Sequence, residues 1–270
     1  MESDPLLYAV GEKDTVNTTA DALADTQLAV PLAVPPHSSL QSHPSPLPKF
    51  HIGWPGPTNS VRVVCVGETY ATTEDPSKIP RGDIYLHAGG FCDYYGNRVC
   101  EFAEYLQRLP HKYKVVIVGT RDAKYSVDIL RATTDAIVLD SPRGATTLVA
   151  GVSIHAVTHL TTSVVGALTV NTFRVNPITC SRDIVVSAVP PRGIFDNSYS
   201  SPREVRNISC GSSYLSEQLA FHPPRVCVFS GAPSDGGAAF IGDTLYANVG
   251  QYYHENGEKI KFGVPIVIDL

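Results

Sequence analysis

The hydrophobic pattern is clearest over Pro80–Asp122, where it predicts a strand, a helix and a second strand. Two short apolar runs, Asp83–His87 and Tyr113–Val118, are separated by a segment with apolar residues at helical spacing. The runs lead into turns that contain Gly90 and Gly119. We therefore expect a βαβ unit whose two turns lie together at the carboxyl edge of a parallel sheet, where open α/β sheets bind ligands.

The same pattern continues on both sides of this unit. Upstream, Val61–Val66 predicts a third strand that also ends in a glycine turn, so three strand ends converge at one edge. Downstream, a capping-box spacing at Ser201–Glu204 predicts the start of a short helix, and Ser213–Phe221 predicts a stronger one with Leu215 and Leu219 facing inward. Further strands are predicted over Ala136–Leu139, Thr146–Thr158 (a hairpin), Thr161–Val175, Asp183–Val189 and Arg225–Phe229, with Ala238–Ile241, Thr244–Val249 and Val264–Ile268 completing a second sheet.

Composition is that of an ordinary globular protein. The 270 residues are 43% apolar and carry a net charge of -5, with no clusters of basic residues, which argues against nucleic acid and anionic membranes as partners. No apolar run is long enough to predict membrane insertion. The six cysteines form no Cys-x-x-Cys pair, so neither a zinc site nor a redox motif is predicted. We expect an intracellular protein, cytoplasmic or within a large cytoplasmic or organellar assembly.

Residues 1–60 differ from the rest of the chain. Acidic residues dominate the first part and prolines the second, which favours an extended arm over helix or strand. No signal or transit peptide is recognised. One interpretation is a disordered tail; the other is an arm that adds an edge strand, lies in a groove or binds a partner through Phe50, Ile52 and Trp54. We place the domain boundary after residue 60, with the domain over 61–270.

Three segments resemble a known family. Lys78–Phe91, Phe102–Val118 and the closing residues Val264–Leu270 are similar to the metallophosphoesterase-domain-containing proteins, a branch of the calcineurin-like metallophosphoesterases. The resemblance implies an α/β fold in which two packed β-sheets form a sandwich with flanking helices. It also implies a two-metal centre, in which a metal-bound hydroxide attacks phosphorus.

The chain departs from the five metal-ligand motifs that the family implies. The first motif, Asp-x-His, reads Glu-Thr-Tyr here, and the second lacks the aspartate that bridges both metals. In the third motif Asn-His is replaced by Thr-Arg, and the histidines of the last two motifs are absent. Since one carboxylate cannot hold two divalent ions, we expect no metal, no other cofactor and no catalytic residue. The corresponding positions are Glu68, Tyr70, Gly90, Thr120, Arg121, Ala188, Gly231 and Pro233.

The leading functional hypothesis is a catalytically inactive pseudoenzyme of this hydrolase family that serves as a structural or assembly subunit, with other protein subunits as partners. An alternative is a metal-free nucleotide or phosphate sensor that uses Arg121 and Arg192. Against it stands the simpler interpretation that Arg121 fills the old metal cavity and pairs with Glu68 or Asp122.

A third hypothesis retains some phosphoric-ester hydrolase activity. Its ligand set would combine Glu68 with His87, His155 or Asp196, although the spacing of these residues does not favour it. A single histidine on a strand is more often an ordinary core or surface residue than a metal ligand.

Overall fold

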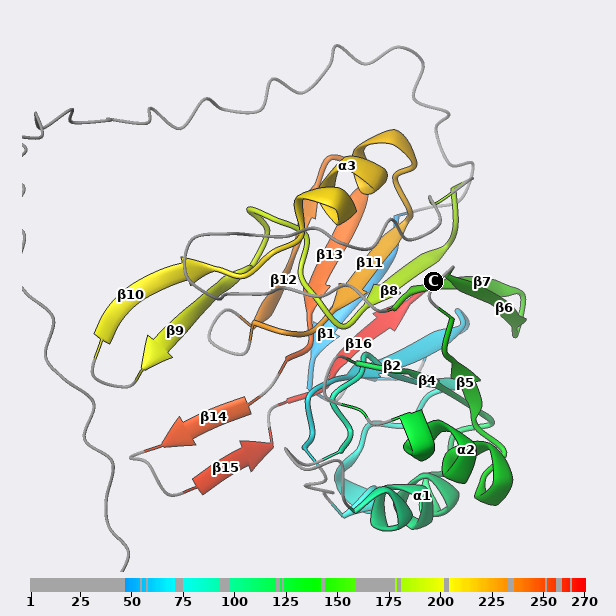
Figure 1. Cartoon of the computed structure of the whole chain (residues 1–270). Helices are drawn as coiled ribbons and strands as arrows, with labels where there is room; N and C mark the ends of the chain where they lie inside the picture. Colours follow the sequence, from blue (N-terminus) through cyan, green and yellow to red (C-terminus); the bar gives the residue numbers. More distant parts are fainter. Residues whose placement is uncertain are drawn as a thin grey trace, which may run out of the picture. The chain divides into compact units, whose positions relative to one another are not determined.

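The computed structural model describes 15 stretches of the chain (Figure 1). They all belong to one compact unit, His43–Leu270, while a second unit, Met1–Ser42, lies outside them. The stretches are residues 47–53, 55–56, 58–70, 75–92, 98–119, 122, 124–141, 144–158, 178, 181–201, 204–232, 236–250, 252–255, 259–262 and 264–270.

The first sheet has six strands and contains the predicted βαβ unit. Strands β2, β3, β4 and β5 are parallel neighbours, and β16 pairs antiparallel with both β2 and β1. Helix α1 (Val99–Arg108) connects β3 to β4, and α2 (Lys124–Thr133) connects β4 to β5. In order across the sheet, the strands are β1 (Lys49–Ile52), β16 (Ile266–Asp269), β2 (Arg62–Val66), β3 (Ile84–His87), β4 (Tyr113–Ile117) and β5 (Ile137–Leu139).

The second sheet also has six strands, and helix α3 (Ser213–Phe221) precedes its strand β11. Strands β7, β8, β11 and β13 are parallel, and antiparallel strands form both edges. The predicted hairpin turns at Ala150 and Gly151, where φ is positive. In order, the strands are β12 (Gly237–Ile241), β13 (Thr244–Asn248), β11 (Val226–Phe229), β8 (Ile184–Ser187), β7 (Val152–Val157) and β6 (Ala145–Val149).

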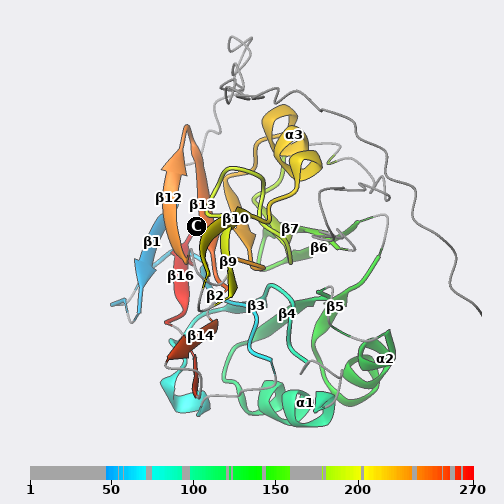
Figure 2. The same ribbon diagram turned by 60° about the vertical axis from the view of Figure 1, so that its left-hand side comes forward.

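Successive side chains of a strand point to opposite faces of its sheet, and this alternation produces a layered core. In β2, Val63 and Cys65 pack between the two sheets, whereas Val64 and Val66 pack with residues of α1 on the other face. The outer face of the second sheet also packs against a helix, since Cys227 of β11 packs with Leu215 and Leu219 of α3. Figure 2 shows α3 on one outer side of the sandwich and α1 and α2 on the other. The predicted α/β sandwich with flanking helices is therefore confirmed.

Two predictions about individual elements are wrong. The segment predicted as Val264–Ile268 forms β16 in the first sheet, not in the second, because it pairs with β2. No helix begins at Ser201; instead β9 (Asn197–Ser201) and β10 (Glu204–Ser209) pair antiparallel. A local capping pattern is weak compared with strand pairing, so tertiary context overrides it.

Some elements were not predicted, and one predicted segment cannot be assessed. The unpredicted elements are helix α2, the 3₁₀ turn η1 (Pro76–Lys78) and the hairpin of β14 (Tyr252–Glu255) and β15 (Lys259–Phe262). The predicted strand Thr161–Val175 lies outside the described residues. None of the helices in the described residues is long and apolar enough to cross a bilayer.

Part of the predicted arm belongs to the first sheet. Strand β1 pairs antiparallel with β16, so residues 49–52, which precede the boundary placed after residue 60, form an edge strand of the domain. Phe50 packs against the core between the sheets, and its ring centroid lies 6.2 Å from that of Phe240 in β12. Ile52 is 64% exposed. Trp54 lies outside the described residues.

Candidate functional site

The turns that follow β2 and β3 are joined by backbone hydrogen bonds at the carboxyl edge of the first sheet. The amide of Glu68 donates to the carbonyl of Gly89 at 2.8 Å, and the amide of Tyr70 donates to the carbonyl of Gly90 at 2.9 Å. These are the turns that carry the first two family motifs. The predicted convergence of strand ends is therefore present, because parallel neighbours end at the same edge.

Asp122 joins the turn after β3 to the turn after β4. Its Oδ2 atom accepts hydrogen bonds from the amides of Gly90 and Gly119, both at 2.8 Å, and its Oδ1 atom accepts one from the amide of Cys92 at 3.0 Å. Burial raises the pKa of this carboxyl group, although the backbone donors act in the opposite direction. Both oxygens are thus occupied with holding the backbone together.

Glu68 and Tyr70 have unusual backbone conformations. Their φ angles are 50° and 46°, in the left-handed region that non-glycine residues rarely adopt. The Tyr70 hydroxyl donates to Oε1 of Glu68 at 2.7 Å. The first motif therefore closes on itself, with the phenol bonded to the single remaining carboxylate.

A side-chain hydrogen bond joins the second sheet to this edge, because the Ser230 hydroxyl donates to the carbonyl of Ala88 at 2.7 Å. Within the second sheet, Nδ2 of Asn248 donates to the carbonyl of Ala232 at 2.8 Å. Gly67 and Gly250 form an isolated parallel bridge between the two sheets. The loops after β2, β3, β11 and β13 are consequently tied into one layer.

Close approach of Glu68 leaves little room for a side chain at the second motif. A Cβ atom added to Gly90 would lie 3.0 Å from the Cα and 3.1 Å from the Cγ of Glu68, and the φ angle of Gly90 is +72°. A Cβ atom on Gly119 would lie 2.7 Å from the amide nitrogen of Gly90. The position of the bridging aspartate is thus tightly packed and in a backbone conformation that favours glycine.

The other motif positions that the structure describes are also packed by main-chain atoms. A Cβ atom on Gly231 would lie 2.8 Å from the carbonyl oxygen of Ala188, and one on Gly89 would lie 2.9 Å from the Cα of Gly119. Thr120, Arg121 and Pro233 lie outside the described residues. The pairing predicted between Arg121 and Glu68 or Asp122 therefore stays a prediction.

The residues of the third hypothesis do not form a ligand set. His87 is fully buried beside Phe102, with 5.0 Å between ring centroids, and burial lowers its pKa to about 3. Nδ1 of His155 lies 2.8 Å from the Thr146 hydroxyl, and Asp196 accepts from the amide of Gly211 at 3.3 Å. In the part of the chain that the structure describes, no three His, Cys, Asp or Glu side chains are placed to hold a metal ion.

The second hypothesis gains no support from Arg192. Arg192 comes directly after Pro191, which forms an isolated bridge with Ser212. Its side chain is exposed, and its amide donates to the Ser212 carbonyl at 3.1 Å. A role of Arg192 in binding phosphate stays a prediction.

Sequence reasoning did not identify three structurally central residues. Asp122 was considered only as a partner for Arg121, and Ser230 and Asn248 were not considered as connectors. The signal for Asn248 is its place at the end of a buried strand, two residues before Gly250, whose amide donates to the Asn248 Oδ1 atom at 2.9 Å. A short amide side chain at a turn often bonds the local backbone in this way.

These residues do not fit a pair of divalent metals. Two-metal hydrolysis requires several oxygen and nitrogen donors around both ions. Among the described motif positions only Glu68 offers such a donor, and Asp122 is engaged by three backbone amides. A Cβ atom added at Gly90 would lie 3.0 Å from the Cα and 3.1 Å from the Cγ of Glu68, so a side chain there would require Glu68 to shift.

Comparison with known proteins confirms the predicted resemblance. Metallophosphoesterase domain-containing protein 1 from Homo sapiens is 38% identical over 82 residues, which are 28% of this chain and 25% of that protein. UPF0046 protein T07D4.2 from Caenorhabditis elegans is 34% identical over 87 residues, which are 32% of this chain and 22% of that protein. The chain thus matches about a quarter of the length of these curated relatives.

Other comparisons are more distant. No family model matches the chain. The crystal structure of phosphopantetheinyl hydrolase (PptH) from Mycobacterium tuberculosis aligns with 71% of this chain and 90% of its own, at 10% identity and a TM-score of 0.43.

Proposed function

We propose that this chain, a relative of the metallophosphoesterase domain-containing proteins in the calcineurin-like superfamily, is a catalytically inactive member that serves as a structural subunit of a protein assembly. The observation that supports catalytic inactivity is the tight packing at Gly90, in the second motif. The added Cβ of Gly90 meets Glu68 at 3.0 Å, and the Gly90 amide is bonded to Asp122.

The packing supports loss of the reaction more strongly than the sequence does. A missing ligand leaves a cavity that another donor or water could fill, whereas here main-chain atoms approach one another at the same place. The hydrogen bonds from Glu68 to Gly89 and from Tyr70 to Gly90 hold them there. Separating these turns would leave buried amides without partners, each at a cost of about 1–3 kcal/mol.

A metal-loading experiment tests catalytic inactivity. The full chain is equilibrated with Mn²⁺ and Zn²⁺, freed of unbound ions by gel filtration, and examined by elemental analysis and by hydrolysis of bis(p-nitrophenyl) phosphate. We expect no tightly held metal and a rate equal to that of buffer. A related enzyme with a complete ligand set serves as the positive control. Two tightly bound ions per chain, or hydrolysis abolished by Glu68→Gln, would contradict the proposal.

The assembly role is supported by the exposed edge of the first sheet. Among the described residues, strand β1 is the outermost strand of its sheet, and Ile52 on it is 64% exposed. An open strand edge with an apolar side chain is a surface that soluble proteins usually protect or pair. Of the predicted partner-binding residues, Phe50 packs partly into its own domain, which leaves Ile52 as the described residue best placed for contact with another subunit.

Matched substitutions test the assembly role. Ile52→Lys adds a charge to the β1 edge, and Leu148→Lys adds the same charge at a side chain on β6 that is 71% exposed. Each variant is expressed in cells of the native source, and the size of its complex is measured by native gel electrophoresis. We expect Ile52→Lys alone to shift the chain to a smaller species. An unchanged large complex in Ile52→Lys, or a monomeric wild type, would refute the role.

A further inference from the structure

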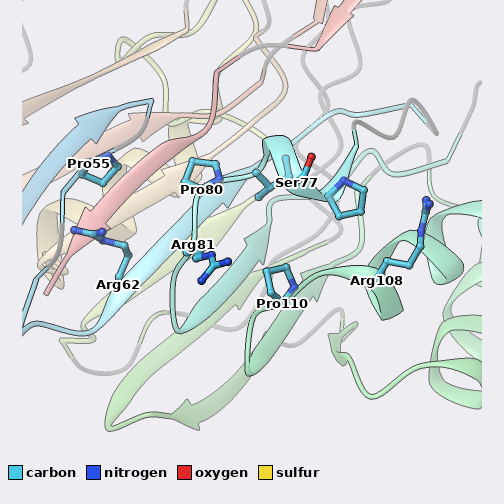
Figure 3. A pocket seen from close by; sticks show the side chains of 9 residues that line it. Pro55, Arg62, Ser77, Pro80, Arg81, Arg108 and Pro110 are labelled. Carbon is cyan, nitrogen blue, oxygen red and sulfur yellow. The ribbon is translucent and has the colours of Figure 1, made fainter.

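A second concave surface lies at the opposite ends of the parallel strands. Arg62 is the first residue of β2, Arg81 precedes β3, and Pro110 precedes β4; all three line a cavity of about 530 Å³ (Figure 3). Strands of four or five residues rise about 3.3 Å per residue, so the cavity is separated from the glycine turns by roughly 13–17 Å. This amino-edge groove is therefore a separate site from the closed motifs.

The walls of the groove are rigid. Pro76, Pro80 and Pro110 line it, and each fixes its own φ angle. The carboxylate of Asp75 accepts from the amide of Ser77 at 3.0 Å and so caps the turn η1. Behind the wall, Nε2 of the buried His111 donates to the carbonyl of Pro80 at 3.0 Å. A ligand would consequently meet a surface that needs little reorganisation on binding.

One arginine of the groove is held in place by an acid. Nε and Nη2 of Arg62 donate to the two carboxylate oxygens of Asp269 at 2.7 and 2.9 Å, in a bidentate pair that is largely buried. Its Nη1 group donates to none of the described residues. The pair with Asp269 thus balances the charge of Arg62 and fixes the orientation of its guanidinium group.

The other two arginines supply exposed positive charge. The side chains of Arg81 and Arg108 are exposed and form no hydrogen bond or ion pair with the side chain of any described residue. In the view of Figure 3, Arg81 lies between Arg62 and Arg108 along the groove, with Pro80 and Pro110 beside it. Three acids belong to this region: Asp269 binds Arg62, Asp83 accepts from the Arg62 amide, and Asp75, which accepts from Ser77, also interacts electrostatically with Arg108.

We propose that the amino-edge groove binds a small organic polyanion, with its phosphate or carboxylate groups on Arg81 and Arg108 and its organic part against the proline rings. The cavity volume falls within the range of about 300–1,000 Å³ that is usual for small-molecule sites. Guanidinium groups bind phosphate and carboxylate oxygens through paired, charge-assisted hydrogen bonds. The proposal depends on no metal, so it stands or falls independently of the proposed function.

Titration calorimetry with two probes tests the proposal. Inorganic tripolyphosphate and citrate are titrated into the full chain, into Arg81→Gln, Arg108→Gln and the double variant, and into Arg131→Gln. Arg131 is an exposed arginine of α2 that does not line the groove, so its substitution matches the change in net charge. The two probes distinguish a phosphate ligand from a carboxylate ligand.

We expect each single substitution in the groove to weaken binding about tenfold or more and the double substitution about a hundredfold, as loss of charge-assisted hydrogen bonds predicts. Arg131→Gln should stay within about twofold of wild type. Circular dichroism confirms that the variants fold, and Arg81→Lys, which keeps the charge, should recover part of the affinity. Absence of binding for both probes, or affinity that survives in the double variant, would overturn the proposal.

Discussion

The carboxylate of Asp122 accepts a hydrogen bond from the backbone amide of Gly90, with 2.8 Å between Oδ2 and N. The same oxygen accepts from Gly119, so a single side chain links the loops after β3 and β4. In a two-metal enzyme of the calcineurin-like type, these loops are expected to carry ligands. Here they are joined to each other, and the first three predictions concern this network and the core behind it.

Restoring the family aspartate should damage the protein instead of restoring a metal site. Gly90→Asp places a Cβ atom 3.0 Å from the Glu68 Cα in a left-handed backbone conformation. We expect urea denaturation to show a loss of roughly 2–4 kcal/mol. The control is Gly151→Asp, which has a similar φ angle of +80° but no atom within 4 Å of the added Cβ, and should lose only about 1 kcal/mol. Equal losses in the two variants would mean that the loops yield easily.

Removing one acceptor should loosen the same loops. Asp122→Asn replaces an oxygen that receives backbone amides with a donor group, so at least one buried amide loses its partner. We expect a loss of about 1–3 kcal/mol in the free energy of unfolding. Asp128→Asn, on the exposed face of α2, makes the same change without burial and should stay within about 0.5 kcal/mol of wild type. A neutral Asp122→Asn would show that the bonds contribute nothing net.

Acid should destabilise the protein in part through His87. Burial lowers the pKa of His87 from 6.5 to about 3, so between these values the unfolded chain binds a proton that the folded chain does not. Stability therefore falls as pH drops from about 6.5 toward about 3. His87→Leu removes this contribution, and its unfolding free energy should fall less steeply with acid. Parallel pH profiles for wild type and variant, measured by urea denaturation, would argue against a neutral buried histidine.

Truncation should reveal which part of residues 1–60 the domain needs. A chain that begins at residue 47 retains β1, whereas a chain that begins at residue 53 loses its pairing with β16 and the packing of Phe50. We expect the first to keep the melting temperature of the full chain. The second should lose about 1.5–3 kcal/mol for the apolar contact, and it should aggregate more readily because β16 becomes an edge. Identical melting curves for the two truncations would show that β1 is dispensable.

The sequence by itself determined the elements whose signal is local. The βαβ unit, the hairpin that turns at Gly151 and the inward face of α3 were predicted correctly, because side-chain periodicity follows directly from strand and helix geometry. The resemblance to the family was equally readable, since it rests on contiguous residues. The departures from the metal-ligand motifs, such as Tyr70 and Gly90, could also be read from the sequence, because they depend on residue identity alone.

Tertiary structure decided everything that depends on residues far apart in the chain. Strand β16 belongs to the first sheet because it pairs with β2, and this pairing could not be seen locally since β2 lies some 200 residues earlier. The helix predicted at Ser201 is replaced by a paired hairpin. Asp122 acquired its role only when two turns approached it, and the groove exists only because Arg62, Arg81 and Arg108 come together from separate elements. Periodicity reports which face of an element is buried, but the partner on that face is set by long-range packing, which no short stretch of sequence contains.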